Sequence, residues 1–243
     1  AEGERGEELA NRFAESMLEE VIHKEGVLKL TAKELHSFDS MSAFGAVPID
    51  LEACHVDFLV SSANKCIEGV PGFGFALCRR SALDECEGRA RSLSLDLYAQ
   101  WKGLDTNGQF RFTPPTHALL AFHRALVELE EEGGVMGRKA RYQANHARIL
   151  AGVQALGLET YVPEEHQCWI ITSVRYPASE AFCFETLYDR LNDRGFVIYP
   201  GKVTDANCFR IGNIGRLFVE DMEALLAALA QVLSDMGVNT RRS

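Results

Sequence analysis

The chain has 243 residues, 47% of them hydrophobic and 25% charged, which is ordinary for a globular protein with a buried core. Its formal net charge of −10 argues against nucleic acid as a partner, because phosphate binding needs clustered Lys and Arg. No apolar run approaches the roughly 18 residues of a membrane span, so a membrane protein is not expected.

The first half of the chain predicts one helix followed by buried strands. An amphipathic helix is expected over residues 7–24, where apolar residues fall near helical spacing. From residue 38 onward, short apolar runs alternate with turn residues, and 57–61 and 74–78 are typical of buried strands in an α/β sheet. The loop between these strands is glycine-rich, which suits unusual backbone angles.

The second half predicts longer helices and a smaller domain. A helix is expected over 116–132, ended by two glycines, and a longer helix over about 135–156. Four leucines are expected on one side of the first of these helices: Leu119, Leu120, Leu126 and Leu129. Further elements are expected as strands at 168–174, 196–199 and 208–211 and helices at 181–193 and 219–236. Such a mixture suggests an α+β C-terminal domain.

Seven cysteines are scattered along the chain without any Cys-x-x-Cys pair. Their odd number and irregular spacing argue against a disulfide framework and against a zinc site. The seven histidines also lack metal-ligand spacing, so no metal site is expected. We expect reduced thiols, mostly buried as small hydrophobic side chains, in a reducing compartment such as the cytoplasm.

Lys65 follows an apolar strand and precedes the glycine-rich turn. The plain interpretation is a solvated surface lysine, since lysines are rarely buried without a partner or a function. The alternative is a lysine that forms a Schiff base with an aldehyde. Such an amine must be partly desolvated and held on a rigid element, and the end of a strand provides one.

Asp39 stands 26 residues before Lys65, after a short apolar segment. One interpretation is that it caps a turn. The other is that its carboxylate pairs with a pyridinium nitrogen, which keeps that ring protonated as an electron sink. Ligands of open α/β sheets bind beyond the carboxyl ends of the strands, so Asp39 and Lys65 at one sheet edge would bracket a flat ring.

Arg210 stands inside an apolar strand pattern, between Phe209 and Ile211. A surface ion pair is the plain interpretation of this arginine. Its position in such a strand favours an anionic partner instead, and its planar fork suits an acidic group such as a carboxylate.

Four stretches together resemble the 2-aminoethylphosphonate–pyruvate transaminases, a family of class V aminotransferases. They are residues 39–50, 57–75, 112–117 and 208–215, within a resemblance that covers about 38–237. The sequence Ser-Ala-Asn-Lys-Cys-Ile-Glu-Gly-Val-Pro-Gly-Phe-Gly at 62–74 is specific to this family. The stretch around Asp39 alone would fit several class V aminotransferases.

The resemblance implies a pyridoxal-phosphate-dependent transferase of the α/β class, with the aspartate-aminotransferase-like fold of type I. Residues 1–134 would form a partial large domain and 135–243 a smaller α+β domain. Lys65 resembles the lysine that forms the Schiff base with the cofactor and moves the proton between the substrate carbon and the cofactor carbon. Asp39 resembles the carboxylate that pairs with the pyridinium nitrogen of the cofactor. Thr113 resembles a hydroxyl that reaches the cofactor phosphate of a neighbouring subunit, which implies a homodimer. Arg210 resembles the arginine that binds the acidic group of the substrate.

The implied reaction moves an amine from 2-aminoethylphosphonate to pyruvate and yields phosphonoacetaldehyde and L-alanine, as in phosphonate degradation. Two alternatives stay open. One is another class V aminotransferase of the alanine–glyoxylate or serine–pyruvate type, against which the stretch around Lys65 argues. The other is a truncated, catalytically impaired relative that only dimerises or binds a partner. It is supported because the phosphate-binding loop and the ring-stacking aromatic residue expected before Asp39 are not found.

Overall fold

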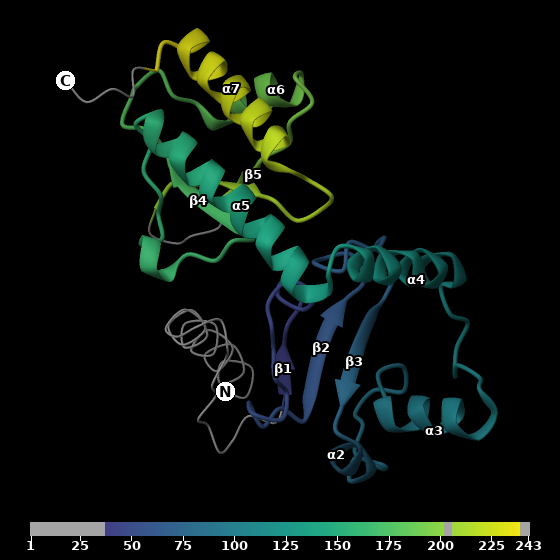
Figure 1. The fold of residues 1–243 in the computed structure, drawn as a ribbon. Helices are drawn as coiled ribbons and strands as arrows, with labels where there is room; N and C mark the ends of the chain where they lie inside the picture. The colour runs from purple at the N-terminus through teal and green to yellow at the C-terminus, as the bar shows by residue number, and fades with distance from the viewer. Residues whose placement is uncertain (1–36, 202–205, 239–243) are drawn as a thin grey trace. The chain divides into compact units, whose positions relative to one another are not determined.

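The computed structural model describes residues 37–201 and 206–238 (Figure 1). These residues divide into two compact units, the first ending at Val135 and the second beginning at Met136, and each unit is described by itself. The helix expected over 7–24 lies outside the described residues. In the part of the chain that is described, no helix is long and apolar enough to cross a membrane.

The first unit contains a three-stranded sheet in the order β1-β2-β3 (Figure 1). Strand β1 is parallel to β2, with Asp39 opposite Val60, and β3 is antiparallel to β2. The carboxyl ends of β1 and β2 therefore meet at one edge of the sheet. The described elements of this unit are β1 (Ser37–Asp39), β2 (Phe58–Ser62), β3 (Gly74–Cys78), α2 (Arg80–Asp84), α3 (Leu97–Asn107) and α4 (Thr116–Glu131).

The two strands expected in this unit are confirmed, with β2 displaced by one residue, and α4 matches the helix expected over 116–132. The expected leucine side of α4 is wrong in part, because Leu120 and Leu126 are exposed. The buried side is formed by Ala118, Ala125 and Leu129. Small alanine side chains let α4 approach the loop that it covers, and they give a weaker periodic signal than leucines do.

The second unit packs helices on one face of an antiparallel sheet in the order β4-β6-β5. Val174, Phe209 and Ile211 point from this sheet into a core that includes Leu187 of α6 and Leu229 of α7. The described elements of this unit are α5 (Gly134–Ala155), whose first two residues belong to the first unit, β4 (Ile171–Arg175), α6 (Phe184–Asn192), β5 (Tyr199–Pro200), β6 (Cys208–Gly212) and α7 (Val219–Asp235), with a short 3₁₀ turn at Glu164–His166.

Helices α5 and α7 and strand β6 agree with their expected ranges to within one residue. Strand β4 and helix α6 are present but begin three residues later than expected, and the strand expected over 196–199 is reduced to β5. Of the described residues in this stretch, Tyr199 and Pro200 pair with β6, while Ile198 is buried in the core. Apolar content alone therefore overstated the length of β5.

The expectation that most cysteines are buried is wrong. Three of the seven are buried, namely Cys54, Cys66 and Cys208, while Cys168 and Cys183 are exposed. None of these seven described cysteines forms a disulfide.

Candidate functional site

Lys65 lies in the loop that follows β2, at the sheet edge where β1 also ends, and its side chain is half-buried. The backbone of this loop is held by hydrogen bonds from the Glu68 N–H to the Lys65 carbonyl at 2.7 Å and from the Gly69 N–H to the Ala63 carbonyl at 2.8 Å. Glu68 has a φ of 64°, a conformation that costs a non-glycine residue roughly 1–3 kcal/mol. The loop thus offers a half-buried lysine on a constrained backbone.

Asp39 is the last residue of β1 and lies at the same edge of the sheet, with an exposed side chain. Its Oδ1 accepts a hydrogen bond from the N–H of Met41 at 2.9 Å, so the turn-capping interpretation is confirmed. A carboxylate has two oxygens and several lone pairs, and this one bond leaves capacity for another donor. The capping role and a ligand role are therefore compatible.

The segment after Asp39 and the loop that carries Lys65 contact each other directly. The Ser61 hydroxyl donates to the Ser40 carbonyl, and the Cys66 thiol donates to the Ser42 carbonyl, both at 3.2 Å. The N–H of Ser40 also donates to the carbonyl of Val60 at 2.8 Å, which extends the pairing of β1 and β2 by one residue. These bonds hold the two segments at a defined separation.

Gly45 permits this close approach. Its φ is 102°, and a Cβ at this position would lie 2.7 Å from Cδ1 of Ile67 and 3.1 Å from the carbonyl carbon of Cys66. Side chains avoid both that backbone conformation and those distances, so only glycine fits without a shift of one segment.

Helix α4 covers the loop that carries Lys65. A Cβ added at Gly72 would lie 2.7 Å from Cβ of Ala118, so the glycine lets the loop lie against the helix. The Phe122 ring of α4 lies 5.2 Å from the Phe73 ring and 5.5 Å from the Phe75 ring. The buried residues at this contact are Ile67, Ala125 and Leu129, with Phe44 and Phe122 packed against them. The helix gives the loop a rigid support.

Two buried hydroxyls at this edge, those of Ser40 and Ser62, have no hydrogen-bond partner among the described residues. Ser62 shares a face of the sheet with Asp39, because Asp39 is opposite Val60 and side chains two apart in a strand point to the same side. A buried hydroxyl without a partner costs about 1–3 kcal/mol, which a bound ligand or water would recover. The Ser62 hydroxyl is thus suited to a polar ligand beside Asp39.

Thr113 precedes α4 by three residues and has an exposed side chain. The contacts of the described residues do not connect it to Lys65 or Asp39. Its suggested role toward a neighbouring subunit stays a prediction.

Arg210 belongs to the second unit, in the central strand β6. Its flanking residues Phe209 and Ile211 point into the core, so Arg210 points to the opposite face of the sheet, beside Ser173 and Tyr199. Its Nε donates to the carbonyl of Pro200 at 3.1 Å. Within the described ranges no carboxylate forms an ion pair with Arg210, so the surface ion-pair interpretation finds no support there.

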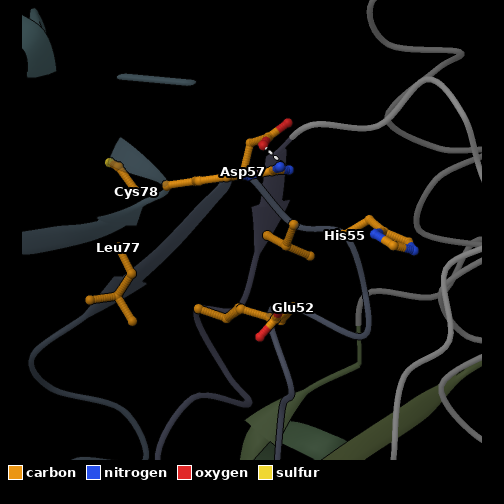
Figure 2. Close-up of a pocket in the computed structure, with 8 residues that line it drawn as sticks. Glu52, His55, Asp57, Leu77 and Cys78 are labelled. Carbon is orange, nitrogen blue, oxygen red and sulfur yellow. Dashed lines mark ion pairs between the residues drawn. The ribbon is translucent and has the colours of Figure 1, made fainter. Parts of the chain in front are cut away.

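A separate pocket of about 520 Å³ opens at the other end of β2 (Figure 2). Asp57 forms an ion pair with Arg79 there, and burial raises the pKa of the Cys78 thiol, with a smaller contribution from Cys86. The pocket is lined by Leu51, Glu52, His55, Val56, Asp57, Leu77, Cys78 and Arg79. None of the four candidate residues lines it.

Sequence reasoning placed Asp39 and Lys65 at one sheet edge but missed the residues that join their segments. Cys66 was expected only as a small buried side chain, and it is fully buried. Its thiol also donates a hydrogen bond to the carbonyl of Ser42, which lies 24 positions earlier in the chain. Gly45 and Ser61 gave no signal of their own. The position of Cys66 next to Lys65 was the one available hint.

Comparison with known proteins identifies relatives for this arrangement. The family model described as aminotransferase class-V matches residues 18–197. A 2-aminoethylphosphonate–pyruvate transaminase from Syntrophobacter fumaroxidans is 54% identical over 200 residues, which cover 82% of this chain and 54% of that protein. The transaminase of the same name from Salmonella schwarzengrund is 50% identical over 209 residues, covering 86% of this chain and 57% of the relative. The chain thus spans little more than half the length of these relatives.

Solved structures give the fold. An alanine–glyoxylate aminotransferase from Nostoc sp. has a TM-score of 0.71 at 25% identity, covering 82% of this chain and 54% of that protein. A pyridoxamine–pyruvate aminotransferase from Mesorhizobium loti has a TM-score of 0.72 at 24% identity, covering 84% and 52%. The α/β fold is that of pyridoxal-phosphate-dependent aminotransferases of fold type I. The chain belongs to the class V aminotransferase family.

Proposed function

We propose that this chain carries the lysine-bearing part of an aminotransferase that moves the amine of 2-aminoethylphosphonate to pyruvate, giving phosphonoacetaldehyde and L-alanine. The observation that carries the proposal is the paired edge of β1 and β2, where the Asp39 and Lys65 segments are bonded to each other. The donor is proposed from the relatives with 54% and 50% identity, whose names specify 2-aminoethylphosphonate.

The residues at this edge fit pyridoxal 5'-phosphate. Lys65 would hold the aldehyde carbon of the cofactor, and the Asp39 carboxylate would bind its ring nitrogen. The buried Ser62 hydroxyl, which lacks a partner among the described residues, would bind one of its polar groups. When bound, the cofactor supplies an electron sink for the substrate carbon that loses a proton. The Lys65 amine would move that proton, since it would lie beside the same ring.

Substrate binding is assigned to Arg210. Its Nε is held by the Pro200 carbonyl, and most of its N–H donors lie on the two Nη groups, which suit a phosphonate or carboxylate. We propose that Thr113 reaches the cofactor phosphate of a second copy in a homodimer. We also propose that the large cofactor domain continues to residue 134, that the small domain spans 135–243, and that the enzyme acts in the cytoplasm.

The first experiment measures visible absorption of the chain with added pyridoxal 5'-phosphate. A Lys65→Ala variant is the test, and Lys102→Ala is the matched control, because Lys102 is an exposed lysine of α3 in the same unit. We expect a band that is lost in the first variant and retained in the second. Borohydride reduction followed by peptide mapping should place the cofactor on Lys65.

Amine donors then separate the alternatives. The proposal expects 2-aminoethylphosphonate with pyruvate to turn over faster than alanine or serine with glyoxylate or pyruvate. The reverse preference would favour an alanine–glyoxylate or serine–pyruvate type. A chain without any Lys65-dependent band would instead be the catalytically impaired relative.

A further inference from the structure

We propose that Cys66 is a positioning residue, whose thiol fixes the separation between the segment that follows Asp39 and the loop that carries Lys65. This inference rests on the proposed function, because the separation matters to catalysis only if both side chains engage one cofactor ring. The thiol contact itself does not depend on any cofactor.

Cys66 is buried at 0% exposure, and its Sγ lies 3.2 Å from the Ser42 carbonyl oxygen. Ser42 belongs to a hydrogen-bonded turn, because the N–H groups of Ala43 and Phe44 both donate to the Ser40 carbonyl, at 3.1 and 3.0 Å. A bond to the Ser42 carbonyl therefore holds that whole turn, which begins one residue after Asp39.

Cys66 is also the residue directly after Lys65, so any displacement of its backbone is passed to Lys65 across one rigid peptide unit. Gly45 limits movement in the opposite direction, because its backbone already lies against Cys66 and Ile67. The separation is thus set from both sides: the thiol bond resists opening, and the contact at Gly45 resists closing.

Burial explains why a weak donor suffices here. A thiol donates weakly in water, but a hydrogen bond in a site of low dielectric constant is strengthened, and water does not compete at a fully buried atom. Cysteine also fills the space as a small hydrophobic side chain, so one residue serves both packing and positioning.

Two substitutions separate these roles. Cys66→Ser keeps a donor but is smaller and more polar, whereas Cys66→Val is apolar, lacks a donor and adds one heavy atom, as Cys54→Val also does. Cys54→Val is the matched control, because Cys54 is a buried cysteine of the same unit at 2% exposure. Melting temperatures of all three report the packing contribution.

The first readout needs no cofactor. Hydrogen exchange of the peptide 40–47, measured by mass spectrometry, should be faster in Cys66→Val than in the parent. It should be parent-like in Cys66→Ser and in Cys54→Val. Equal exchange of this peptide in Cys66→Val and the parent would overturn the inference, whatever the enzymatic activity.

The second readout uses the chain with pyridoxal 5'-phosphate. We expect Cys66→Val to lower kcat about 10- to 100-fold, since misplacement by about 1 Å costs on that order, and to leave the KM for pyruvate near its parent value. Cys66→Ser should recover most of the kcat. If Val preserves kcat and Ser loses it, packing alone matters and the positioning role is refuted. A parent without activity but with the expected exchange pattern would refute the proposed function and leave the thiol contact standing.

Discussion

Substitution of Gly45 by alanine tests the close approach of the two segments most directly. The added Cβ would meet Cδ1 of Ile67 at 2.7 Å and backbone atoms of Cys66 and Ile67 at 3.1 and 3.2 Å. The isoleucine atom ends a flexible side chain, but Ile67 is itself buried at 1% exposure and the other two contacts are backbone. Relief of the clash therefore requires the segments to move apart.

The cost has two parts. A positive φ costs alanine roughly 1–2 kcal/mol relative to glycine. Overpacking of a buried contact costs a further 1–3 kcal/mol, roughly. We expect Gly45→Ala to lower the free energy of unfolding by about 2–5 kcal/mol, a large share of the roughly 5–15 kcal/mol typical of a domain.

Gly108→Ala is the control that isolates the clash. Gly108 has a φ of 72°, but a Cβ there would have no atom within 4 Å. Its substitution should therefore cost only the backbone part, about 1–2 kcal/mol. The excess cost at Gly45 measures the crowding between the two segments.

Urea unfolding followed by tryptophan fluorescence provides the measurement. The chain has two tryptophans, Trp101 in the first unit and Trp169 in the second. In a Trp169→Phe background the signal reports only the unit that contains Gly45. A loss of stability in Gly45→Ala no greater than in Gly108→Ala would show that the segments do not touch there.

Two further predictions concern charge. Burial lowers the pKa of His146 below its ordinary 6.5, and the nearby Gln167 side chain and the charge of Glu164 offset part of this effect. The unfolded chain therefore binds a proton at His146 more readily than the folded chain does, so the free energy of unfolding should fall as the pH drops below 6.5. The fall should be smaller in His146→Asn. Equal slopes of unfolding free energy against pH in the two proteins, followed by Trp169 fluorescence, would contradict this. Asp57→Asn should lower the free energy of unfolding by about 1–2 kcal/mol, a value kept small because Arg79 is half exposed and its charge is screened by solvent. A double-mutant cycle with Arg79→Gln should show a coupling energy between the two residues, and strictly additive losses would contradict the ion pair.

The sequence predicted the elements whose signal is local. Strand β3 and helix α4 carry their own apolar pattern and turn residues, and both match within one residue. Helix α3 has no buried residue, so it shows no apolar stripe and was missed. Both ends of α3 nevertheless carry capping residues. The Asp96 side chain accepts a hydrogen bond from the N–H of Ala99, and Gly108 ends the helix in the left-handed conformation. Caps predict helices that hydrophobic periodicity does not.

The candidate site was predictable to the extent that it lies at strand ends. Asp39 and Lys65 each follow an apolar segment, and the parallel pairing of β1 with β2 brings those ends together. The contacts that hold them there join residues 21 and 24 positions apart. Such contacts depend on strand register and on the absence of a side chain at Gly45, neither of which a local pattern encodes.

Asp39 and Arg210 each have a backbone contact that engages part of the charged group. At Asp39 a backbone N–H occupies Oδ1, and at Arg210 a backbone carbonyl occupies Nε. In each case the bond restricts the side chain and leaves atoms directed elsewhere, Oδ2 of the carboxylate and the two Nη groups of the guanidinium. A charged side chain held in this way loses less freedom when it meets a ligand, so these contacts would favour the ligand roles proposed for Asp39 and Arg210.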